Sequence, residues 1–157
     1  MNDRYQVSSS YGGPEYEAIA GFSSNCGVDD LQAAAKANEL CNQYTLDTIS
    51  CSSAISFAME CFEHGLIGLK ETGGIDLRFG NAEAMVQLVE KLGKREGVGD
   101  LLADGAKFAA DRINKDSYKL AATIKGVETT GYDLRCLKTA ALGFAVSFRG
   151  ADHNRHG

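Results

Sequence analysis

The stretch TISCSSAISFAMECFEHG, residues 48–65, decides what kind of fold this sequence forms. Drawn as a helix, it carries apolar side chains on several sides, as a buried helix does. Gly65 stands where such a helix would end, and glycine is common at that position. Serines gather in its first half, at Ser50, Ser52, Ser53 and Ser56. The stretch therefore predicts a central, buried helix whose thin first half lets a neighbouring helix or a ligand approach closely.

Apolar residues at helical spacing predict further helices on both sides of this stretch. The expected ranges are 29–44, 81–96, 100–114 and 133–148, the last as one helix or a pair. Residues that commonly cap helices stand at or before the expected starts, at Asp29 and Asp30, Asp47, Asn81 and Asp100. Residues 121–128 are the best strand candidate, but they are few. The sequence therefore predicts an all-α, multihelical fold.

The chain length allows one domain or two small helical subdomains, because 157 residues can bury a real core. Residues 1–27 are rich in Ser, Gly and Tyr, and an irregular lead-in segment is expected there. Residues 28–157 are expected to form the helical domain. A boundary between two subdomains is expected, if there is one, near residues 66–80, which include a loop-like stretch.

Charge and hydropathy argue against two classes of partner. The net charge is −5 and the pI is about 5.2, with no cluster of Lys and Arg, which argues against a nucleic-acid surface. No apolar run approaches bilayer length, and the first residues, MNDRYQVSSSYGG, lack the apolar core of a secretory signal. We therefore expect a cytoplasmic protein without a nucleic-acid or membrane partner.

The cysteines show no local metal-binding pattern. They are Cys26, Cys41, Cys51, Cys61 and Cys136, an odd number, and no C-x-x-C occurs. Their spacing therefore carries no local zinc or iron–sulfur signature. Buried free thiols in a reducing compartment are the expected state.

Two carboxylates flank a tyrosine directly after the sole proline of the chain. Glu15 and Glu17 lie on either side of Tyr16, after Pro14. Carboxylates in a rigid segment suit general acid–base chemistry or cation binding. A solvated loop is the simpler explanation of the same residues, and the residue types alone leave both open.

Asn42 and Asp47 bracket the junction before the central helix. Capping alone explains Asp47, because a carboxylate suits a helix N-terminus. A carboxylate at that position can also accept hydrogen bonds from the N–H groups of a heterocyclic ligand. Residue chemistry favours capping.

One of the three histidines is a candidate proton donor. His153 lies between Asp152 and Asn154 at the end of the last expected helix, and polar neighbours can orient its ring. His64, at a helix C-terminus, and His156, near the end of the chain, are better explained as surface residues.

Several segments form an ordered series along the chain. They are GGPEYEAIAGFSSNCGVDD, KANELCNQYTLDTIS, ISFAMECFEHGLI, RFGNAEAM, REGVGDLLADG and GFAVSFRGADHN. This series resembles the middle portion of the tungsten-dependent aldehyde ferredoxin oxidoreductase family, from about Tyr5 to His153. The segments GPEYE, LDTIS and RFGNAEAM are the most specific parts of the resemblance.

The resemblance implies the helical part of a larger redox enzyme. In that family an N-terminal β-rich domain and two helical domains enclose a tungsten ion held by two pterin cofactors. A [4Fe-4S] cluster passes electrons to ferredoxin, and its cysteines come from a C-x-x-C-x-x-x-C motif and one distant C-terminal cysteine. This sequence aligns with the helical domains alone, so we expect it to lack the pterin-binding β domain and the cluster ligands.

The resemblance also assigns residues to cofactor binding. The family's D-x-x-G-L-D motif, which contacts one pterin, aligns with residues 42–47. Leu46 and Asp47 match it, whereas Asn42 replaces an aspartate and Thr45 replaces the glycine. If that glycine has a positive φ, a β-branched threonine there is strained. Asn42, Leu46 and Asp47 are therefore the expected cofactor-binding residues, with Thr45 the more serious departure.

Two further residues are implied to be catalytic. Glu17, in GPEYE, matches a family glutamate near the tungsten, and His153, in GADHN, matches the histidine expected to assist proton transfer at the substrate carbonyl. Some relatives also bind an iron at a subunit interface through an E-x-x-H pair. The sequence contains no such pair, so no metal ligated by this chain is predicted.

The implied reaction is oxidation of an aldehyde to a carboxylic acid, or the reverse. Its partners would be a small aldehyde or carboxylate substrate, the missing cofactor domain, and ferredoxin or another electron carrier. Similar catalytic subunits reduce aromatic thioesters, and this variant stays open. A truncated or degenerate helical domain without catalysis also stays open, and the changes at Asn42 and Thr45 favour it for the isolated chain.

Overall fold

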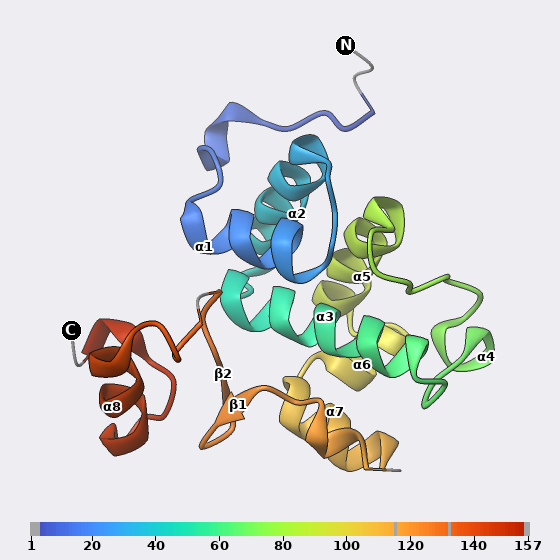
Figure 1. Cartoon of the computed structure of the whole chain (residues 1–157). Helices are drawn as coiled ribbons and strands as arrows, with labels where there is room; N and C mark the ends of the chain where they lie inside the picture. Colours follow the sequence, from blue (N-terminus) through green and yellow to red (C-terminus); the bar gives the residue numbers. More distant parts are fainter. Residues whose placement is uncertain (1–3, 115, 132, 156–157) are drawn as a thin grey trace.

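The computed structural model describes residues 4–114, 116–131 and 133–155 (Figure 1). The predicted all-α, multihelical fold is confirmed. Its helices are α1 (Tyr16–Ile19), α2 (Leu31–Tyr44), α3 (Thr48–Glu63), α4 (Leu69–Thr72), α5 (Ala82–Lys94), α6 (Val98–Leu102), α7 (Ala106–Ile113) and α8 (Lys138–Val146). A π-helical turn follows α1 (Ala20–Asn25), and 3₁₀ turns lie at Ser9–Tyr11, Ser117–Lys119 and His153–Arg155. The strands β1 (Thr123–Ile124) and β2 (Val127–Glu128) form a short antiparallel hairpin.

Helix α3 is the predicted central helix. Figure 1 shows it crossing the middle of the main body, with α1 and α2 on one side and α6 and α7 on the other. Ile55, Phe57 and Met59 are buried along it. One hydrophobic cluster extends from Ala18 to Ala110, so buried side chains on both sides of residues 66–80 belong to the same core.

Three of the predicted helix caps are confirmed. Asp30 accepts a hydrogen bond from the backbone N–H of the third α2 residue at 3.0 Å. Asp47 and Asn81 cap α3 and α5 in the same way, at 2.7 and 3.1 Å. Gly65 adopts φ +69° just after α3, where glycine avoids the penalty that a Cβ would meet.

The prediction of one helix at residues 100–114 is wrong. The segment contains the end of α6 and the whole of α7, and Gly105 separates the two helices with φ +97°. Asp100 is therefore not a cap: it lies inside α6 and forms an ion pair with Arg112 at 3.3 Å. The buried carboxylate of Glu128 instead accepts the N–H of Ala106 at 2.8 Å, so a residue distant in sequence satisfies the start of α7.

The irregular lead-in expected at residues 1–27 needs correction. Helix α1 and the π-helical turn occupy residues 16–25, and Phe22 is fully buried there. Gly21 explains the tight packing, because a Cβ on it would lie 2.7 Å from the Cβ of Ser52 in α3. The π-helical turn is therefore the neighbour that packs closely against the serine-rich first half of α3.

The C-terminal part differs from its predicted helix and strand. The hairpin pairs Thr123 with Glu128, and its turn has positive φ at Lys125 and Gly126. Within the range 133–148, where a helix or a pair was expected, the structure has one helix, α8 (Lys138–Val146). This helix lies to one side of the main body in Figure 1, and it buries Phe144 while Val146 stays 70% exposed.

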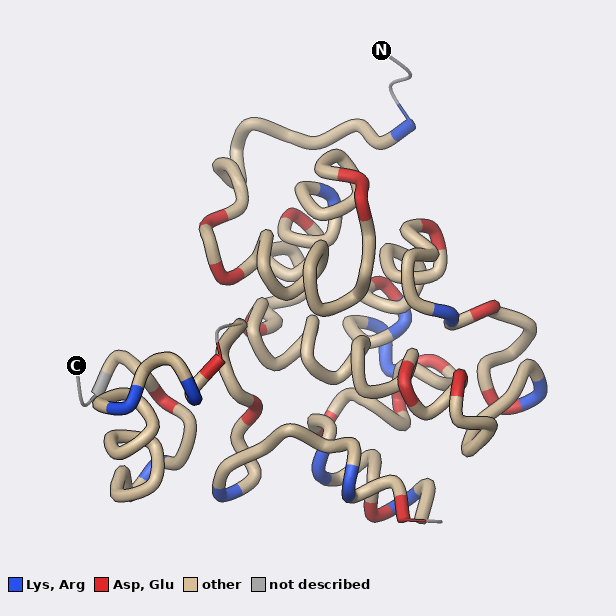
Figure 2. Tube along the Cα trace, in the orientation of Figure 1, with Lys and Arg blue, Asp and Glu red and all other residues tan. Residues whose placement is uncertain are grey.

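Charges are mixed over the surface. Figure 2 shows Lys and Arg interspersed with Asp and Glu along the helices, without a basic stripe on the described residues. None of the helices in the described part of the chain combines the length and the apolarity that crossing a bilayer requires.

Candidate active site and cofactor-contact region

Two predicted catalytic residues from opposite ends of the chain lie side by side. Glu17 is in the first turn of α1, and His153 begins the last 3₁₀ turn. Glu17 Oε1 lies 4.0 Å from His153 Nε2, and the side chains are 21% and 28% exposed. The separation exceeds a direct hydrogen bond, but catalytic hydrogen bonds are often long before a ligand is bound. The structure therefore brings these two residues together at a partly open site.

The second carboxylate oxygen of Glu17 is held by the backbone. Glu17 Oε2 accepts the N–H of Gly131 at 3.1 Å, across 114 residues of sequence. A Cβ at Gly131 would lie 2.8 Å from the Cβ of Ala20, so a glycine is required for this approach. The contact orients Glu17 with its other oxygen toward His153.

The loop before His153 is fitted closely to the hairpin. Gly150 has φ +85°, and a Cβ there would lie 2.1 Å from the carbonyl oxygen of Ile124. Lys125 Nζ also donates to the carbonyl oxygen of Ser147 at 2.6 Å. The hairpin therefore holds in place the loop that precedes His153.

Asp152 shapes the turn at His153, as the polar sequence GADHN suggested. Its Oδ1 accepts the N–H of Asn154 at 3.2 Å, and its Oδ2 pairs with Arg149 Nε at 3.3 Å. These contacts determine how the backbone turns at His153, and the turn sets where the imidazole projects.

The neighbouring candidates are surface residues. Glu15 is exposed and makes no capping hydrogen bond at the start of α1, and Tyr16 is 64% exposed. His64 is exposed at the end of α3, as predicted. His156 lies outside the described residues.

Asp47 caps α3 and also lines a small hollow. One carboxylate oxygen accepts the N–H of Ser50 at 2.7 Å. The hollow has a volume of about 160 Å³ and includes Leu46, which also packs against the core. Its lining residues are Thr45, Leu46, Asp47, Ser50, Cys51, Ala54, Leu92, Leu102, Ala103 and Gly105.

Thr45 has the positive φ that would make a threonine strained at the position of the family's glycine. Its φ of 58° and ψ of 40° place it in the left-handed region at the end of α2. The N–H of Leu46 bonds back to the carbonyl of Cys41 at 2.8 Å, which gives the helix-ending motif usually built on glycine. The turn is therefore made in spite of the threonine side chain.

Asn42 does not share the hollow with the other two expected cofactor-binding residues. It is exposed near the end of α2, and its Nδ2 donates to the carbonyl of Asn38 at 2.9 Å. Leu46 and Asp47 thus form one local contact surface, and Asn42 lies beside it on the helix.

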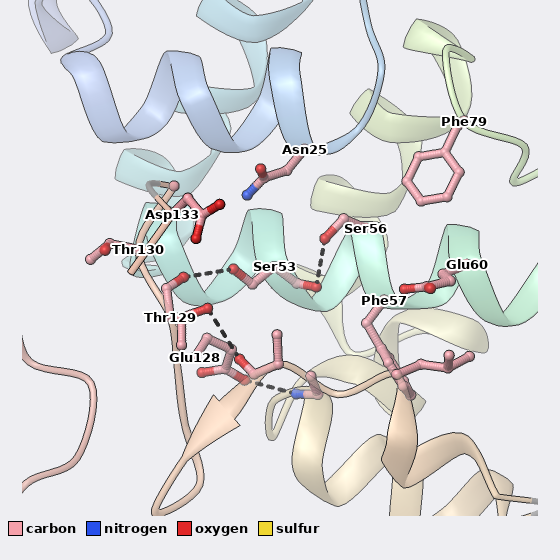
Figure 3. Close-up of a pocket in the computed structure, with 14 residues that line it drawn as sticks. Asn25, Ser53, Ser56, Phe57, Glu60, Phe79, Glu128, Thr129, Thr130 and Asp133 are labelled. Atoms are coloured by element: carbon pink, nitrogen blue, oxygen red, sulfur yellow. Dashed lines mark hydrogen bonds between the residues drawn. The ribbon is translucent and has the colours of Figure 1, made fainter. Parts of the chain in front are cut away.

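A larger pocket, which we call the polar pocket, was not predicted from sequence. It has a volume of about 360 Å³ and lies between α3, the end of the π-helical turn and the segment after β2 (Figure 3). Its lining residues are Asn25, Ser53, Ser56, Phe57, Glu60, Phe79, Ala106, Leu120, Ala122, Glu128, Thr129, Thr130, Gly131 and Asp133. The serines of α3 were the available signal, but the remaining walls come from distant segments.

Four of the five thiols are buried as predicted, whereas Cys136 is exposed. Burial raises the pKa of Cys26 to about 12 and the pKa of Cys61 to about 11. A hydrogen bond with Cys41, and then burial, raise the pKa of Cys51. Among the described residues, no three His, Cys, Asp or Glu side chains gather closely enough to hold a metal ion.

A partly open carboxylate–imidazole pair near a polar pocket suits acid–base chemistry. The family model described as aldehyde ferredoxin oxidoreductase, domains 2 & 3, matches residues 1–157. The chain therefore belongs to the aldehyde ferredoxin oxidoreductase family, a family of oxidoreductases.

Individual relatives agree with this assignment. The tungsten-containing aldehyde ferredoxin oxidoreductase of Pyrococcus abyssi is 38% identical over 144 residues, which are 90% of this chain and 23% of the relative. The aliphatic sulfonate oxidoreductase, WOR-like subunit, of Pyrococcus furiosus is 30% identical over 89% of this chain and 23% of the relative. The chain thus spans about a quarter of the length of these relatives.

A solved structure has a similar fold. The active site complex BamBC of benzoyl coenzyme A reductase, in complex with 1,5-dienoyl-CoA, matches with a TM-score of 0.66 and 26% identity. The match covers 75% of this chain and 18% of that one.

The α2–α3 junction offers the kinds of group that would contact the edge of a pterin. Asp47 Oδ2 is engaged by Ser50, so its other oxygen can accept N–H groups of a ring, and Leu46 offers an apolar wall. A hollow of about 160 Å³ is smaller than the usual ligand pocket of about 300–1,000 Å³. A group as large as a pterin would therefore need further contacts outside this hollow.

Proposed function

We propose that this chain supplies acid–base and cofactor-contact residues to a tungsten–pterin oxidoreductase that converts an aldehyde to a carboxylic acid, or the reverse. Membership of the family supports the reaction class. The observation that carries the proposal is the meeting of Glu17 with His153, because residues so far apart in sequence share one partly open site.

The reaction sets the task for these residues. Oxidation of R–CHO with one water gives R–COO⁻, three protons and two electrons. When bound, the tungsten–bis-pterin group would supply the two-electron oxidation, and the electrons would leave singly through a [4Fe-4S] cluster to ferredoxin or another carrier. The protons remain to be moved by side chains.

Glu17 and His153 carry out these proton transfers together. Glu17 Oε2 is held by the N–H of Gly131, so Oε1 is left to accept a proton from water or from the imidazole. His153 Nε2 faces that oxygen and can donate a proton to a substrate carbonyl oxygen or return it to Glu17. The pair thereby moves protons between the reacting carbonyl and solvent.

Asp47 and Leu46 hold one edge of a pterin. The carboxylate oxygen not engaged by Ser50 accepts ring N–H groups, and charge-assisted hydrogen bonds of this kind are the strong ones. Capping and cofactor binding then use different oxygens of the same side chain.

The test uses the tungsten-loaded enzyme that contains this chain, with a viologen dye as electron acceptor. Glu17→Gln and His153→Asn should each lower kcat about 10²–10⁴-fold, as loss of a general acid or base does. Tungsten and pterin contents should stay unchanged, and Glu15→Gln, an exposed neighbour, should keep full kcat. Variants of Glu17 and His153 that keep kcat within about twofold would refute the proposed roles.

Reductive chemistry on an aromatic thioester is a second candidate, favoured by the structural similarity to the benzoyl coenzyme A reductase complex. Assays with an aldehyde plus viologen, and with an aromatic CoA thioester plus a reduced donor, separate the two reactions. A fully loaded enzyme that turns over neither substrate would favour the non-catalytic domain instead.

A further inference from the structure

The polar pocket lies next to Glu17. Gly131 lines this pocket and also donates its N–H to Glu17 Oε2 at 3.1 Å. A ligand filling the pocket therefore rests against the residue that holds the carboxylate in place. Its volume of about 360 Å³ is within the range of small-molecule sites.

The two serine hydroxyls that α3 contributes to the pocket are already used as donors. Ser56 Oγ donates to the carbonyl of Ser53 at 3.1 Å, and Ser53 Oγ donates to the carbonyl of Thr129 at 3.4 Å. A hydroxyl has one proton and two lone pairs, so these groups face a ligand chiefly as acceptors. Figure 3 shows the Asn25 amide and the Asp133 carboxylate pointing into the space beside them.

The charged lining is acidic. Asp133 is paired with Arg135 at 2.7 Å, which compensates its charge, and Glu128 uses one oxygen on the N–H of Ala106. Glu60 adds another carboxylate on the α3 wall. The described residues that line the pocket include no Lys or Arg. Carboxylates accept hydrogen bonds, attract cations and repel anions.

Aromatic rings complete the wall near Glu60. Phe57 and Phe79 both line the pocket, and Figure 3 shows the two rings on opposite sides of the Glu60 carboxylate. Ring faces attract ammonium groups through the cation–π interaction. The acidic and the aromatic groups thus favour the same kind of ligand.

We propose that the polar pocket binds the part of the substrate remote from its carbonyl and selects a hydrogen-bond donor there: an ammonium group first, a hydroxylated group second, an anionic group last. The identification of the occupant as substrate rests on the proposed function, whereas the order of preference rests on the lining residues alone. A CoA thioester, with its phosphates, is disfavoured at this pocket.

Binding of three matched probes to the full 157-residue chain tests the order of preference. The probes are 2-aminoethanol in its ammonium form, ethylene glycol and glycolate, followed by backbone amide chemical shifts at Ser53, Ser56, Thr129 and Gly131. Probes this small bind weakly, so titrations reach high millimolar concentrations. The ammonium probe should half-saturate these shifts at a concentration at least about tenfold below glycolate, with ethylene glycol between them.

Two variants assign the selectivity to Glu60. Glu60→Gln should raise the half-saturating concentration of 2-aminoethanol about tenfold and leave ethylene glycol within about twofold. Glu96→Gln makes the same charge change at an exposed residue outside the pocket and should change neither. Glycolate binding as tightly as 2-aminoethanol, equal behaviour of the two variants, or shifts confined to other surfaces would each overturn the proposal.

Kinetics in the loaded enzyme separates this inference from the proposed function. The ratio of kcat/KM for 6-hydroxyhexanal to that for 6-oxohexanoate, whose distinguishing groups are remote from the carbonyl, should be at least about tenfold, and Glu60→Lys should reduce or reverse it. A ratio near one would overturn the substrate preference while leaving aldehyde oxidation intact. Absence of turnover with any aldehyde, together with the expected order of probe binding, would instead refute the proposed function.

Discussion

The α2–α3 junction and the Glu17–His153 site carry predicted functional residues in contrasting ways. The junction is local: Thr45, Leu46 and Asp47 are consecutive, and the adjoining Cys41 and Cys51 are buried. The Glu17–His153 site is assembled from both ends of the chain and remains partly open. Helix-ending and capping chemistry alone builds the first, whereas the second depends on glycines that let distant segments approach. Substitutions should therefore affect the two regions differently.

At neutral pH, the largest loss of stability is expected from Gly150→Ala in the assembled site. The new Cβ would overlap the carbonyl oxygen of Ile124 at a residue with φ +85°, so strain and overpacking add to about 3 kcal/mol of lost stability. Gly74→Ala is the matched control, because its φ is +89° but nothing lies within 4 Å of the new Cβ. Chemical denaturation, with hydrogen exchange of residues 147–155, measures both. Equal losses in the two variants would show that the hairpin does not hold this loop.

Alkaline pH tests how closely the Cys26 thiol, at the end of the π-helical turn, is enclosed. Burial raises the pKa of Cys26 to about 12 from an ordinary value of 9.0, so the folded chain keeps this proton after the unfolded chain loses it. Stability is complete below pH 9 and falls between pH 9 and 12, by about 1.4 kcal/mol per pH unit for this thiol. Cys26→Ala should reduce the slope of the unfolding free energy against pH, with Cys51 and Cys61 still contributing, whereas alanine at the exposed Cys136 should leave the slope unchanged. A slope unaffected by Cys26→Ala would argue that the thiol is not closely enclosed.

A smaller loss is expected for Gly131→Ala. Its Cβ would lie 2.8 Å from that of Ala20, so the segment must shift and the hydrogen bond to Glu17 must lengthen. We expect a loss of about 1–3 kcal/mol by chemical denaturation, with a lower kcat in the loaded enzyme. Full stability together with full kcat would show that Glu17 does not need this contact.

Asp47 separates capping from cofactor binding within the junction. Asp47→Ala should cost about 1 kcal/mol, whereas Asp47→Asn should cost only a few tenths because Asn caps comparably. Both variants should lose tungsten and pterin from the assembled enzyme, as a charge-assisted hydrogen bond is removed in each. Melting temperature and metal content are measured together. Full cofactor content in Asp47→Asn would leave Asp47 as a cap alone.

The smallest effect is a gain at Thr45. Its left-handed conformation costs about 1–2 kcal/mol for a residue with a side chain, and Gly relieves this at an entropic cost of about 0.5–1 kcal/mol. Thr45→Gly should therefore stabilise the chain by about 0.5 kcal/mol, measured as a shift in the denaturation midpoint. Destabilisation would mean that the threonine makes a compensating contact.

Sequence reasoning predicted most of the helices because their signals are local. The buried face of α3 and the caps at Asp30, Asp47 and Asn81 depend on residues within a few positions of each other. It failed at residues 100–114, where Gly105 and the distant Glu128 divide the helix, and at residues 16–25, where packing against Ser52 orders a segment that looked irregular.

The sequence by itself therefore determined the helical class and the cap at Asp47, and its resemblance to a family singled out Glu17 and His153 as the proposed catalytic residues. Only the tertiary structure decided that these two side chains lie 4.0 Å apart and that Gly131, which lines the polar pocket, donates to Glu17. The physical reason is that periodicity and capping act over a few residues. The approach of α1, the hairpin and the last turn instead depends on close packing at Gly21, Gly131 and Gly150.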